Sequence, residues 1–598
     1  MPDWSYRTFI RPTLMRCAPE SARKVCIGVL SFIGKNRMGR TAIDFLGHMR
    51  ADSRLSKSVG GHMFPGPIGI GSLLDPHAKA LAVFSGFGCG FLVVGPVGAE
   101  SVAPIDWGVD LRSGKVSHRG RKPTVGIAEV AARLLEPGRA AVPVFVELEI
   151  VTSESIKLLR PLVAGFIVKP EHVPLFNEHR GGFRGLLLID ADPRTTELPS
   201  CHDADGLWLA GVCEEPERIK AARNSVGEKI IVCGPADSPR DANKFLENGA
   251  NLVFVDAGLA TSGPGLVKRT NEALLSRHPK PETPALSLDA ARQSWFWGLM
   301  LGLALLGGGI LATILASSRV ILPYDETLCG IPRGSFASIN PRLLPFMAHD
   351  RMTLAGSMLS LGILYVAIAW NGIRLGLHWA KSALVVSSGI GFFSFFLFLG
   401  YGYFDPFHAF ITSILVQFVF FTMLTRLGKP HPPAIADWEE TAEWRRGQWG
   451  QLLFIGLGVG LVVAGLVISY VGCTTVFVGT DLEFLRIAAV KALVGTDRLI
   501  PLIAHDRASL GGMLLSNGVM IWLAAQWGMR AGTRWLWLAL ASAGNVAFAT
   551  AIGVHIVVGY TSWMHLAPAF AGWFVWLLAL GLTKGWLCRA HASKFSSL

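Results

Sequence analysis

Two copies of a His-Asp-Arg triplet are the residues of this 598-residue chain whose types and spacing could do chemistry. His349-Asp350-Arg351 recurs 156 positions later as His505-Asp506-Arg507, and each triplet lies just before a long apolar run. Ionisable side chains beside hydrocarbon are rare and are functional suspects by default. An imidazole whose tautomer a carboxylate fixes, next to a planar guanidinium group, has the chemistry of an anion-binding pocket.

The similarity between the two copies extends well beyond the triplets. Asp325 sits 156 residues before Asp481, and the group Gly402, Tyr403 and His408 matches Gly559, Tyr560 and His565. Self-similarity at a nearly fixed offset indicates an internal repeat. We predict that His408 and His565 form a second polar wall of each pocket. The structural alternative is that the aspartates cap helices, the arginines extend to the interface and the histidines lie in a wet boundary layer.

The elements that carry these residues are predicted to be membrane helices. The chain is 51% hydrophobic and 16% charged, and the apolar excess begins at Trp295, where segments become long enough to cross a bilayer. Eight candidate spans lie near residues 295–317, 352–370, 383–400, 406–424, 452–471, 510–527, 536–558 and 565–583. They form two groups of four, and an even number of spans per group predicts two parallel four-helix repeats.

Charge and targeting signals predict the orientation. No charged-then-apolar leader opens the sequence, and Lys and Arg gather in the expected inner connections but are absent from the outer turns 401–405 and 559–564. The positive-inside rule then places both termini in the cytoplasm and both triplets on the extracytoplasmic side. We predict an integral protein of a bacterial inner membrane. Membrane topology explains the net charge of +12, and no basic patch interleaved with aromatics indicates nucleic acid.

Metal and haem centres are not indicated by the spacing. The nine cysteines show no CxxC pair and no metal-type arrangement, so we predict neither a disulfide framework nor a metal site. A haem held across the membrane would need histidines at different depths, whereas His349 and His408 are expected at one surface. The expected spans carry no charge at mid-depth, which argues against a proton relay through the bilayer.

The first half of the chain predicts a different architecture. Eight apolar runs alternate with stretches of helical length: residues 66–71, 91–97, 142–149, 165–169, 185–190, 206–211, 229–234 and 252–258. Near-continuous apolar strands separated by helices indicate a parallel sheet covered on both faces. Eight such units predict a (β/α)8 TIM-type barrel with its site residues just after the strands.

Several barrel segments resemble the class 2, quinone-linked dihydroorotate dehydrogenases. The matching segments are Tyr6–Lys24, the run from Phe64 to Asp75, Gly86–Gly95, and Asn248–Gly258 with Gly263–Val267. The resemblance implies a helical N-terminal extension and a barrel that holds FMN, oxidises dihydroorotate in pyrimidine biosynthesis and passes electrons to a membrane quinone. It covers residues 6 to 275 and leaves the membrane half unrecognised.

The chain departs from that family where the family does its chemistry. Pro76 stands in place of a flavin-contacting Lys, a short basic stretch, Arg112–Lys122, replaces an Asn-rich loop, and the strands that should deliver Asn, Ser and Lys read Gly165–His172 and Leu186–Asp192. Only the phosphate end is partly matched, so the resemblance places a phosphate site at Gly234, Ala257 and Gly258, near a helix N-terminus. The catalytic residues stay unknown. The remaining polar groups at strand ends, which are either a replacement site or solvated loop residues, are Glu147, Glu149, Lys169, Asp190, Asp192 and Asp256.

These observations leave three readings of function. The chain is a flavin- and quinone-linked oxidoreductase, or a pseudoenzyme barrel that serves as sensor or scaffold for the membrane half, or a transport or lipid-related protein that works through its His-Asp-Arg pockets.

The predicted organisation is a helical extension (1–45), the barrel (46–280), a linker (281–293), repeat A (294–428), a cytoplasmic linker (429–450), repeat B (451–585) and a tail (586–598).

Overall fold

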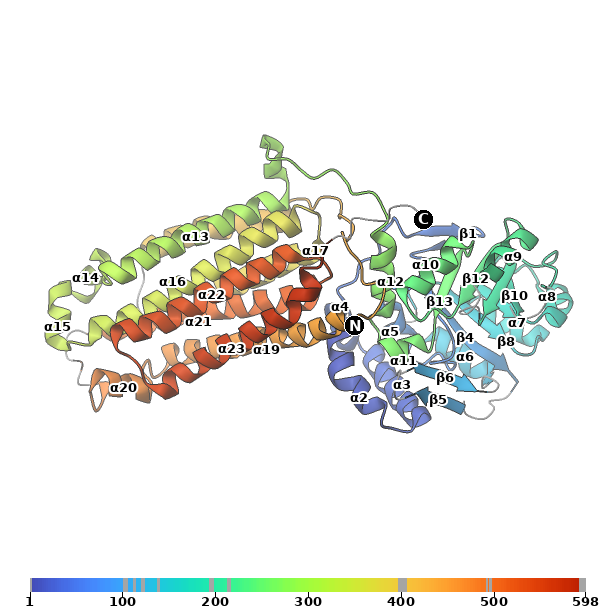
Figure 1. Cartoon of the computed structure of the whole chain (residues 1–598), viewed down its shortest axis with the longest axis horizontal. Coiled ribbons are helices and arrows are strands. Elements are labelled where there is room, and N and C mark those ends of the chain that lie inside the picture. The colour runs from blue at the N-terminus through green and yellow to red at the C-terminus, as the bar shows by residue number, and fades with distance from the viewer. Residues whose placement is uncertain are drawn as a thin grey trace. The chain divides into compact units, whose positions relative to one another are not determined.

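The computed structural model describes residues 3–99, 106–110, 115–119, 124–136, 140–192, 198–211, 217–395, 406–490, 493 and 497–590. The chain divides into two compact units (Figure 1). The barrel unit comprises Met1–Pro279 and Pro432–Thr441, and the membrane unit comprises Lys280–His431 and Ala442–Leu598. A segment that lies between the two repeats in sequence therefore belongs to the barrel unit. Within that unit, Glu440 pairs with Arg7 and Arg269.

Eight parallel strands close the predicted barrel, one in each predicted run. Strand β3 pairs with both β13 and β4, which closes the sheet. The strands read as continuous apolar runs because helices cover one face and a packed interior fills the other. Their bounds are β3 (Ile68–Ile70), β4 (Phe91–Gly98), β8 (Val144–Leu148), β9 (Gly165–Val168), β10 (Leu186–Ala191), β11 (Gly206–Ala210), β12 (Ile230–Gly234) and β13 (Leu252–Val255).

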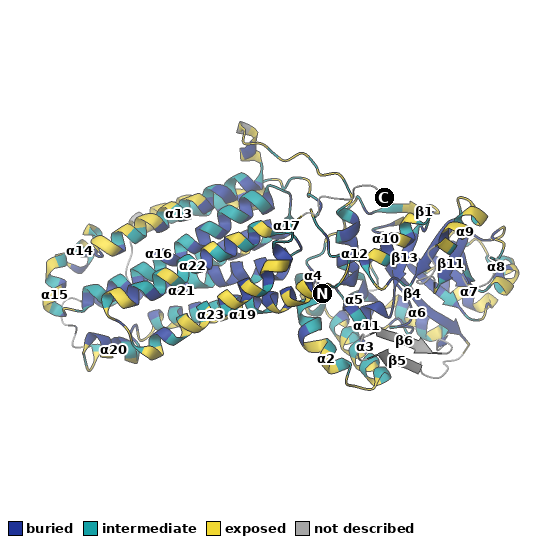
Figure 2. Ribbon diagram, viewed as in Figure 1, coloured by how far each residue is buried: buried dark blue, intermediate teal, exposed yellow. Residues whose placement is uncertain are grey.

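The barrel has an inner and an outer core. Its strands are largely buried and appear dark blue in Figure 2. Large aromatic side chains fill the interior, where Trp208 stacks on Phe254 with ring centroids 4.2 Å apart. The hairpin of β1 (Lys57–Val59) and β2 (His62–Phe64) adds Phe64 to this interior core. The covering helices are α5 (Leu81–Ser85), α6 (Ile127–Leu135), α7 (Ser153–Leu159), α8 (Val173–His179), α9 (Glu217–Val226), α10 (Pro239–Glu247), α11 (Gly258–Ser262) and α12 (Leu266–Leu275).

Two smaller features complete the barrel unit. A hairpin of β5 (Asp106–Asp110) and β6 (Lys115–Arg119) and the short β7 (Val125–Gly126) follow β4, and part of the predicted basic stretch 112–122 lies outside the described residues. The N-terminal extension is helical, as predicted: α1 (Asp3–Ser5), a π-helical turn (Tyr6–Ile10), α2 (Arg11–Leu14), α3 (Pro19–Lys35) and α4 (Arg37–Gly47). Asn36 begins α4 by accepting a hydrogen bond from Gly39 N, a normal N-cap contact.

The membrane unit contains eight long helices among its described residues. Six are long and apolar enough to cross a membrane. The other two, α17 and α18, border residues 396–405, so the end of the predicted span 383–400 lies outside the description. The helices are α13 (Ser294–Ser318), α16 (Leu343–Ile368), α17 (His378–Phe395), α18 (Pro406–Leu424), α19 (Ala442–Cys473), α21 (Leu499–Leu523), α22 (Arg534–Val558) and α23 (Trp563–Leu587).

The two predicted repeats have the same internal structure. Helices α16 and α21 each continue into a π-helical turn, Ala369–Ile373 and Ala524–Gly528. A short helix precedes each of them, α14 (Pro323–Cys329) and α20 (Gly479–Leu485). Helix α13 packs on α16 as α19 packs on α21, and α16 packs on α22 as α21 packs on α17. The repeats therefore interlock through α16 and α21.

Glycines let the paired helices approach closely at matching positions. A Cβ on Gly302 of α13 would lie 2.7 Å from Val366 N, and one on Gly458 of α19 would lie 2.7 Å from Trp522 N. These glycines are 156 residues apart. Small residues at helix contacts are the usual solution where lipid removes the hydrophobic driving force between helices.

Candidate functional site

The first His-Asp-Arg motif lies inside α16, because this helix begins at Leu343, nine residues before the predicted span. Arg351 does not extend to an interface. Its Nε donates to Asp506 Oδ2 at 2.8 Å, and its Nη1 donates to Asp325 Oδ2 at 2.8 Å. Asp506 belongs to the second repeat, so the guanidinium group of one motif binds the carboxylate of the other.

The second motif makes the corresponding contacts, with the roles of the two repeats exchanged. Arg507 of α21 pairs through Nη1 with Asp481 Oδ2 at 2.7 Å and through Nε with Asp350 Oδ2 at 3.3 Å. Asp481 is the α20 counterpart of Asp325 in α14. Burial alone would raise the pKa of Asp481, but the Arg507 guanidinium and several hydrogen bonds outweigh burial and lower this pKa. The sequence predicts that both guanidinium groups bind an anion, and in the structure carboxylates of the protein itself bind them.

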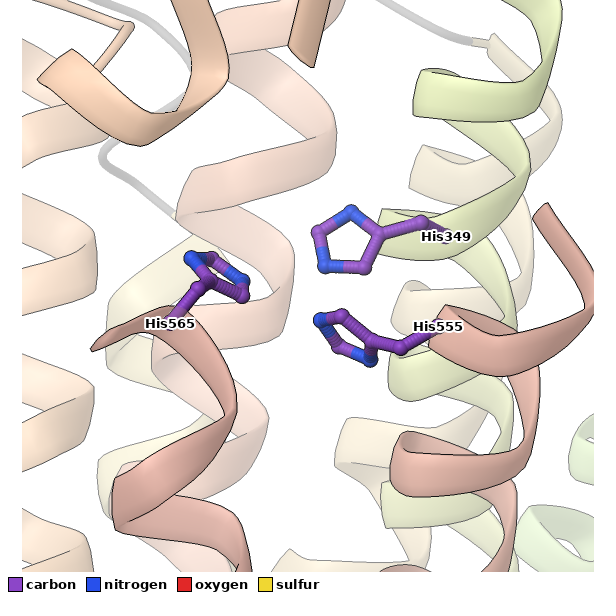
Figure 3. A group of neighbouring side chains, drawn as sticks. All are labelled: His349, His555 and His565. Carbon is purple, nitrogen blue, oxygen red and sulfur yellow. The ribbon is translucent and has the colours of Figure 1, made fainter. Parts of the chain in front are cut away.

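Three histidines meet beside this network (Figure 3). The ring of His349 lies 4.4 Å from that of His555 and 5.5 Å from that of His565, measured between centroids. The predicted neighbour, His408, instead stacks on His505 at 5.6 Å. His349 of the first motif therefore faces α23, the fourth helix of the second repeat. His505 of the second motif faces α18, the fourth helix of the first repeat.

Tyr560 connects the three-histidine cluster to the ion-pair network. It lies between α22 and α23, and its hydroxyl donates to Asp481 Oδ1 at 2.8 Å. Burial raises the pKa of Tyr560 well above its ordinary value, so the hydroxyl keeps its proton as a donor. The same oxygen lies 3.3 Å from His565 Nδ1.

An apolar layer covers the network at this end of the bundle. It is built from both repeats around Phe346, Phe477 and Phe484. The guanidinium group of Arg507 lies over the Phe346 ring at 5.1 Å, a cation–π geometry. The buried charges are thereby shielded from water, which strengthens their mutual interactions.

His555 is the residue that sequence reasoning missed. It lies in the last turn of α22 within a run of apolar residues, and the positions 156 and 157 residues earlier, Leu399 and Phe398, are not histidines. The repeat that revealed the other histidines therefore gives no signal for this one. Its place one turn before the Gly559-Tyr560 pair is the only local indication.

The mouth of the barrel carries mainly acidic groups that pair locally. Lys169 Nζ donates to Glu149 at 2.8 Å, and Ser72 Oγ donates to Glu147 at 3.3 Å. Asp256 is buried and accepts from Leu73 N at 3.1 Å. Asp190 lies near the end of β10, and Asp192 comes directly after this strand.

The residues of the predicted phosphate site have a carboxylate beside them. Gly234, Ala257 and Gly258 do lie at the ends of β12 and β13, as expected. However, the Asp237 carboxylate lies against Gly258, where an added Cβ would be 3.1 Å from its Oδ1, and the Ala236 amide donates to Phe254 O. An anion here would meet a carboxylate rather than the cluster of free amides and cations that phosphate sites use.

An apolar cavity of about 370 Å³ lies between the N-terminal helices and the barrel. Leu30 and Ile33 of α3, Leu14 of α2, and Phe84 and Phe87 at α5 line its wall. Arg23 is the charged residue of the lining, and Glu20 binds it through two hydrogen bonds of 2.8 and 2.6 Å.

Tyr6 closes one side of the same cavity. Its hydroxyl donates to Ala260 O at 2.5 Å, and burial raises its pKa to about 12. With Tyr6 and Arg23 both satisfied by protein groups, the remaining lining is suited to an uncharged, hydrophobic ligand.

Comparison with known proteins finds relatives of the barrel. No protein-family model matches the chain. The N-terminal part is 29% identical over 147 residues to the quinone-dependent dihydroorotate dehydrogenase of Deinococcus deserti, and it is 34% identical over 95 residues to that of Chloroflexus aurantiacus. These matches cover 24% and 15% of this chain, and 40% and 26% of the two relatives, so the chain matches less than half of either protein.

Solved structures of the same class are also similar. Two crystal structures of dihydroorotate dehydrogenase from Eimeria tenella, one ligand-free and one with ferulenol, share 16% and 15% identity with this chain at TM-scores of 0.34 and 0.32. Each covers 40% of this chain, and 94% and 90% of its own. The barrel is thus dihydroorotate dehydrogenase-like in sequence, which confirms the resemblance predicted for the N-terminal part.

Proposed function

We propose that the barrel unit binds a quinone-like apolar molecule and serves as a ligand-binding sensor or scaffold for the membrane unit. The observation that carries this proposal is the apolar cavity beneath the N-terminal helices. The curated relatives bear quinone in their names, and the cavity has the apolar lining that such a ligand needs. A role without catalysis agrees with the acidic, internally paired barrel mouth.

The outer face of α3 supports access to the cavity from a membrane. Val25, Val29 and Phe32 are 63%, 52% and 72% exposed, and their spacing places them along one side of the helix. Val25 and Val29 also line the cavity. A helix with an exposed apolar side and basic flanks is suited to lie at a lipid interface, where an isoprenoid-type ligand is dissolved.

The test is equilibrium binding of a short-chain ubiquinone analogue to the full-length protein in mild detergent. Ala22 lines the cavity whereas its neighbour Ser21 is exposed and does not, so Ala22→Phe and Ser21→Phe form a matched pair. We expect Ala22→Phe to weaken binding at least tenfold, about 1.4 kcal/mol, and Ser21→Phe to bind like the unaltered protein. Equal affinity of the two variants, or no binding by the unaltered protein, would reject the cavity as the site.

The second candidate is the flavin- and quinone-linked oxidoreductase. The similarity of the barrel to dihydroorotate dehydrogenases favours it, and the carboxylates at the phosphate end oppose it. An absorbance spectrum and mass analysis of a denatured extract measure bound FMN directly. Stoichiometric flavin, with reduction of a quinone analogue by dihydroorotate, would replace the sensor proposal by the enzymatic one.

The membrane unit is proposed to work through its paired His-Asp-Arg motifs at the extracytoplasmic surface. The positive-inside distribution supports this orientation. Joining of the motifs across the two repeats supports a single shared centre rather than two separate pockets. Cysteine accessibility of Thr561→Cys, placed in the turn beside the centre, reports the side: labelling of intact cells by an impermeant reagent is expected, and labelling only after permeabilisation would reverse the orientation.

A further inference from the structure

The three-histidine cluster has the geometry of an open ligand set. The candidate ligand nitrogens of His349, His555 and His565 all lie within 4.8 Å of one another. Figure 3 shows one ring nitrogen of each residue turned toward the space that the three rings share. Zn–N bonds of about 2.0–2.1 Å in a tetrahedral site place ligand nitrogens roughly 3.4 Å apart. Small ring movements would therefore bring the cluster to bonding distance of one ion.

His555 is buried with an unused ring nitrogen. Its Nδ1 lies 2.5 Å from Ala551 O, which only accepts, so Nδ1 carries the proton and Nε2 holds a lone pair. Within the described part of the chain this Nε2 is buried and has no hydrogen-bond partner. A buried acceptor left unpaired is destabilising. Coordination of a cation would satisfy it.

The Nδ1 atoms of the other two histidines face outer groups. His349 Nδ1 lies 3.2 Å from Asp350 Oδ1, and His565 Nδ1 lies 3.3 Å from the Tyr560 hydroxyl. Histidine ligands of metals commonly present one nitrogen to the ion while the other contacts a carboxylate, a carbonyl or another polar group, which fixes the ring. His555 and His565 follow this pattern if Nε2 is the ligand atom, whereas His349 Nδ1 lies near the carboxylate without a hydrogen bond among the described residues.

The charge of the surrounding network also favours a cation. Arg351 and Arg507 contribute two positive charges, whereas the four aspartates that they bind contribute four negative charges. Among these six side chains, two negative charges are in excess, and they lie in a buried region where charge is costly. A divalent ion bound by three neutral imidazoles would balance them, and imidazole ligands suit Zn, Cu, Fe and Ni rather than Ca or Mg.

We propose that His349, His555 and His565 bind one divalent transition-metal ion per chain, at a site shared by the two repeats. The duplicated position should not bind a second ion in this way. There His505 and His408 face each other, but the position that corresponds to His555 is occupied by Phe398 or Leu399. The inference is independent of ligand binding by the barrel unit.

The experiment uses the full-length protein purified in mild detergent, stripped with a chelator and reloaded with Zn²⁺ alone. Bound metal is counted by elemental mass spectrometry after desalting. We expect one Zn²⁺ per chain, at least a 100-fold weaker affinity in His555→Ala, and unchanged stoichiometry in His408→Ala, which alters the matching position of His565. Failure of the unaltered protein to retain Zn²⁺, or equal retention by His555→Ala, would overturn the proposal.

Two further variants keep the result decisive if His555→Ala does not fold. His565→Gln retains a polar side chain and is expected to lose stoichiometric Zn²⁺. Asp350→Asn removes the carboxylate beside His349, together with one negative charge that Arg507 binds, and should weaken Zn²⁺ binding about 10- to 100-fold. Elution volume and thermal melting identify folded samples, and a folded His565→Gln protein that keeps one Zn²⁺ with unchanged affinity would refute the assigned ligand set.

Discussion

Arg351 and Arg507 explain why the motif occurs twice. Each guanidinium group binds an aspartate of its own repeat, Asp325 or Asp481, and an aspartate of the other repeat, Asp506 or Asp350. Neither copy could satisfy its buried charges alone. Buried ion pairs of this kind add little net stability over apolar packing, but loss of one partner leaves a charge unpaired. The duplication therefore has a structural role in addition to any role in binding.

Replacement of Arg351 by Ala should destabilise the membrane unit strongly. Asp325 and Asp506 would both lose their cationic partner inside the bundle, and breaking a buried pair in this way costs about 3–5 kcal/mol. Denaturation in detergent, followed by circular dichroism, measures the loss. Arg292→Ala is the control, because the Arg292 side chain is 86% exposed and its ion pair is with the exposed Asp289. Similar stability of both variants would show that the cross-repeat pairs do not hold the repeats together.

At the scale of the element, the strands and helices could be predicted mainly from hydrophobic periodicity and from the internal repeat. All eight strands lie in the predicted apolar runs because burial on both faces leaves an uninterrupted signal. Helix starts were less predictable: α16 begins at Leu343, and its first turns include the charged motif. Hydropathy cannot mark such a start, because side chains paired in the fold look like surface residues in the sequence.

The composition of the centre was predictable only where the repeat revealed it. His349 matches His505 and His408 matches His565, whereas His555 has no counterpart and resembles an ordinary histidine within an apolar helix. The exchange of partners, with His349 beside His565 and His408 beside His505, depends on how α16 and α21 cross. Spacing along one chain does not contain that information.

The close contact of α13 with α16 yields a prediction for a pair of glycines on one helix. A side chain at Gly302 would meet the Val366 backbone, whereas Gly307 has no atom within 4 Å of an added Cβ. Gly302→Leu should therefore separate the helices and lower the melting temperature of the membrane unit, with Gly307→Leu close to the unaltered protein. Overpacking of this kind typically costs about 1–3 kcal/mol. Equal melting temperatures would mean that α13 can shift without loss.

At the scale of the whole molecule, the chain combines two units with separate cores. The barrel unit is organised around its strands and the cavity below α3. The membrane unit has its own apolar cluster over the charged network. A ligand that binds only the folded form of one unit stabilises that unit by mass action. The two proposed ligands, a quinone-like molecule and a metal ion, should therefore leave distinct signatures.

Hydrogen exchange with mass spectrometry can resolve those signatures along one chain. Zn²⁺ at about 100 times its dissociation constant should add about 2.7 kcal/mol to the membrane unit, seen as slower exchange at the end of α22 and the start of α23. Peptides from β8 to β12 should exchange at an unchanged rate, because the barrel strands contribute no proposed ligand. Chelation should reverse the protection, and His408→Ala should preserve it. Protection by Zn²⁺ spread evenly over both units, or absent from α22 and α23, would assign the ion to other residues.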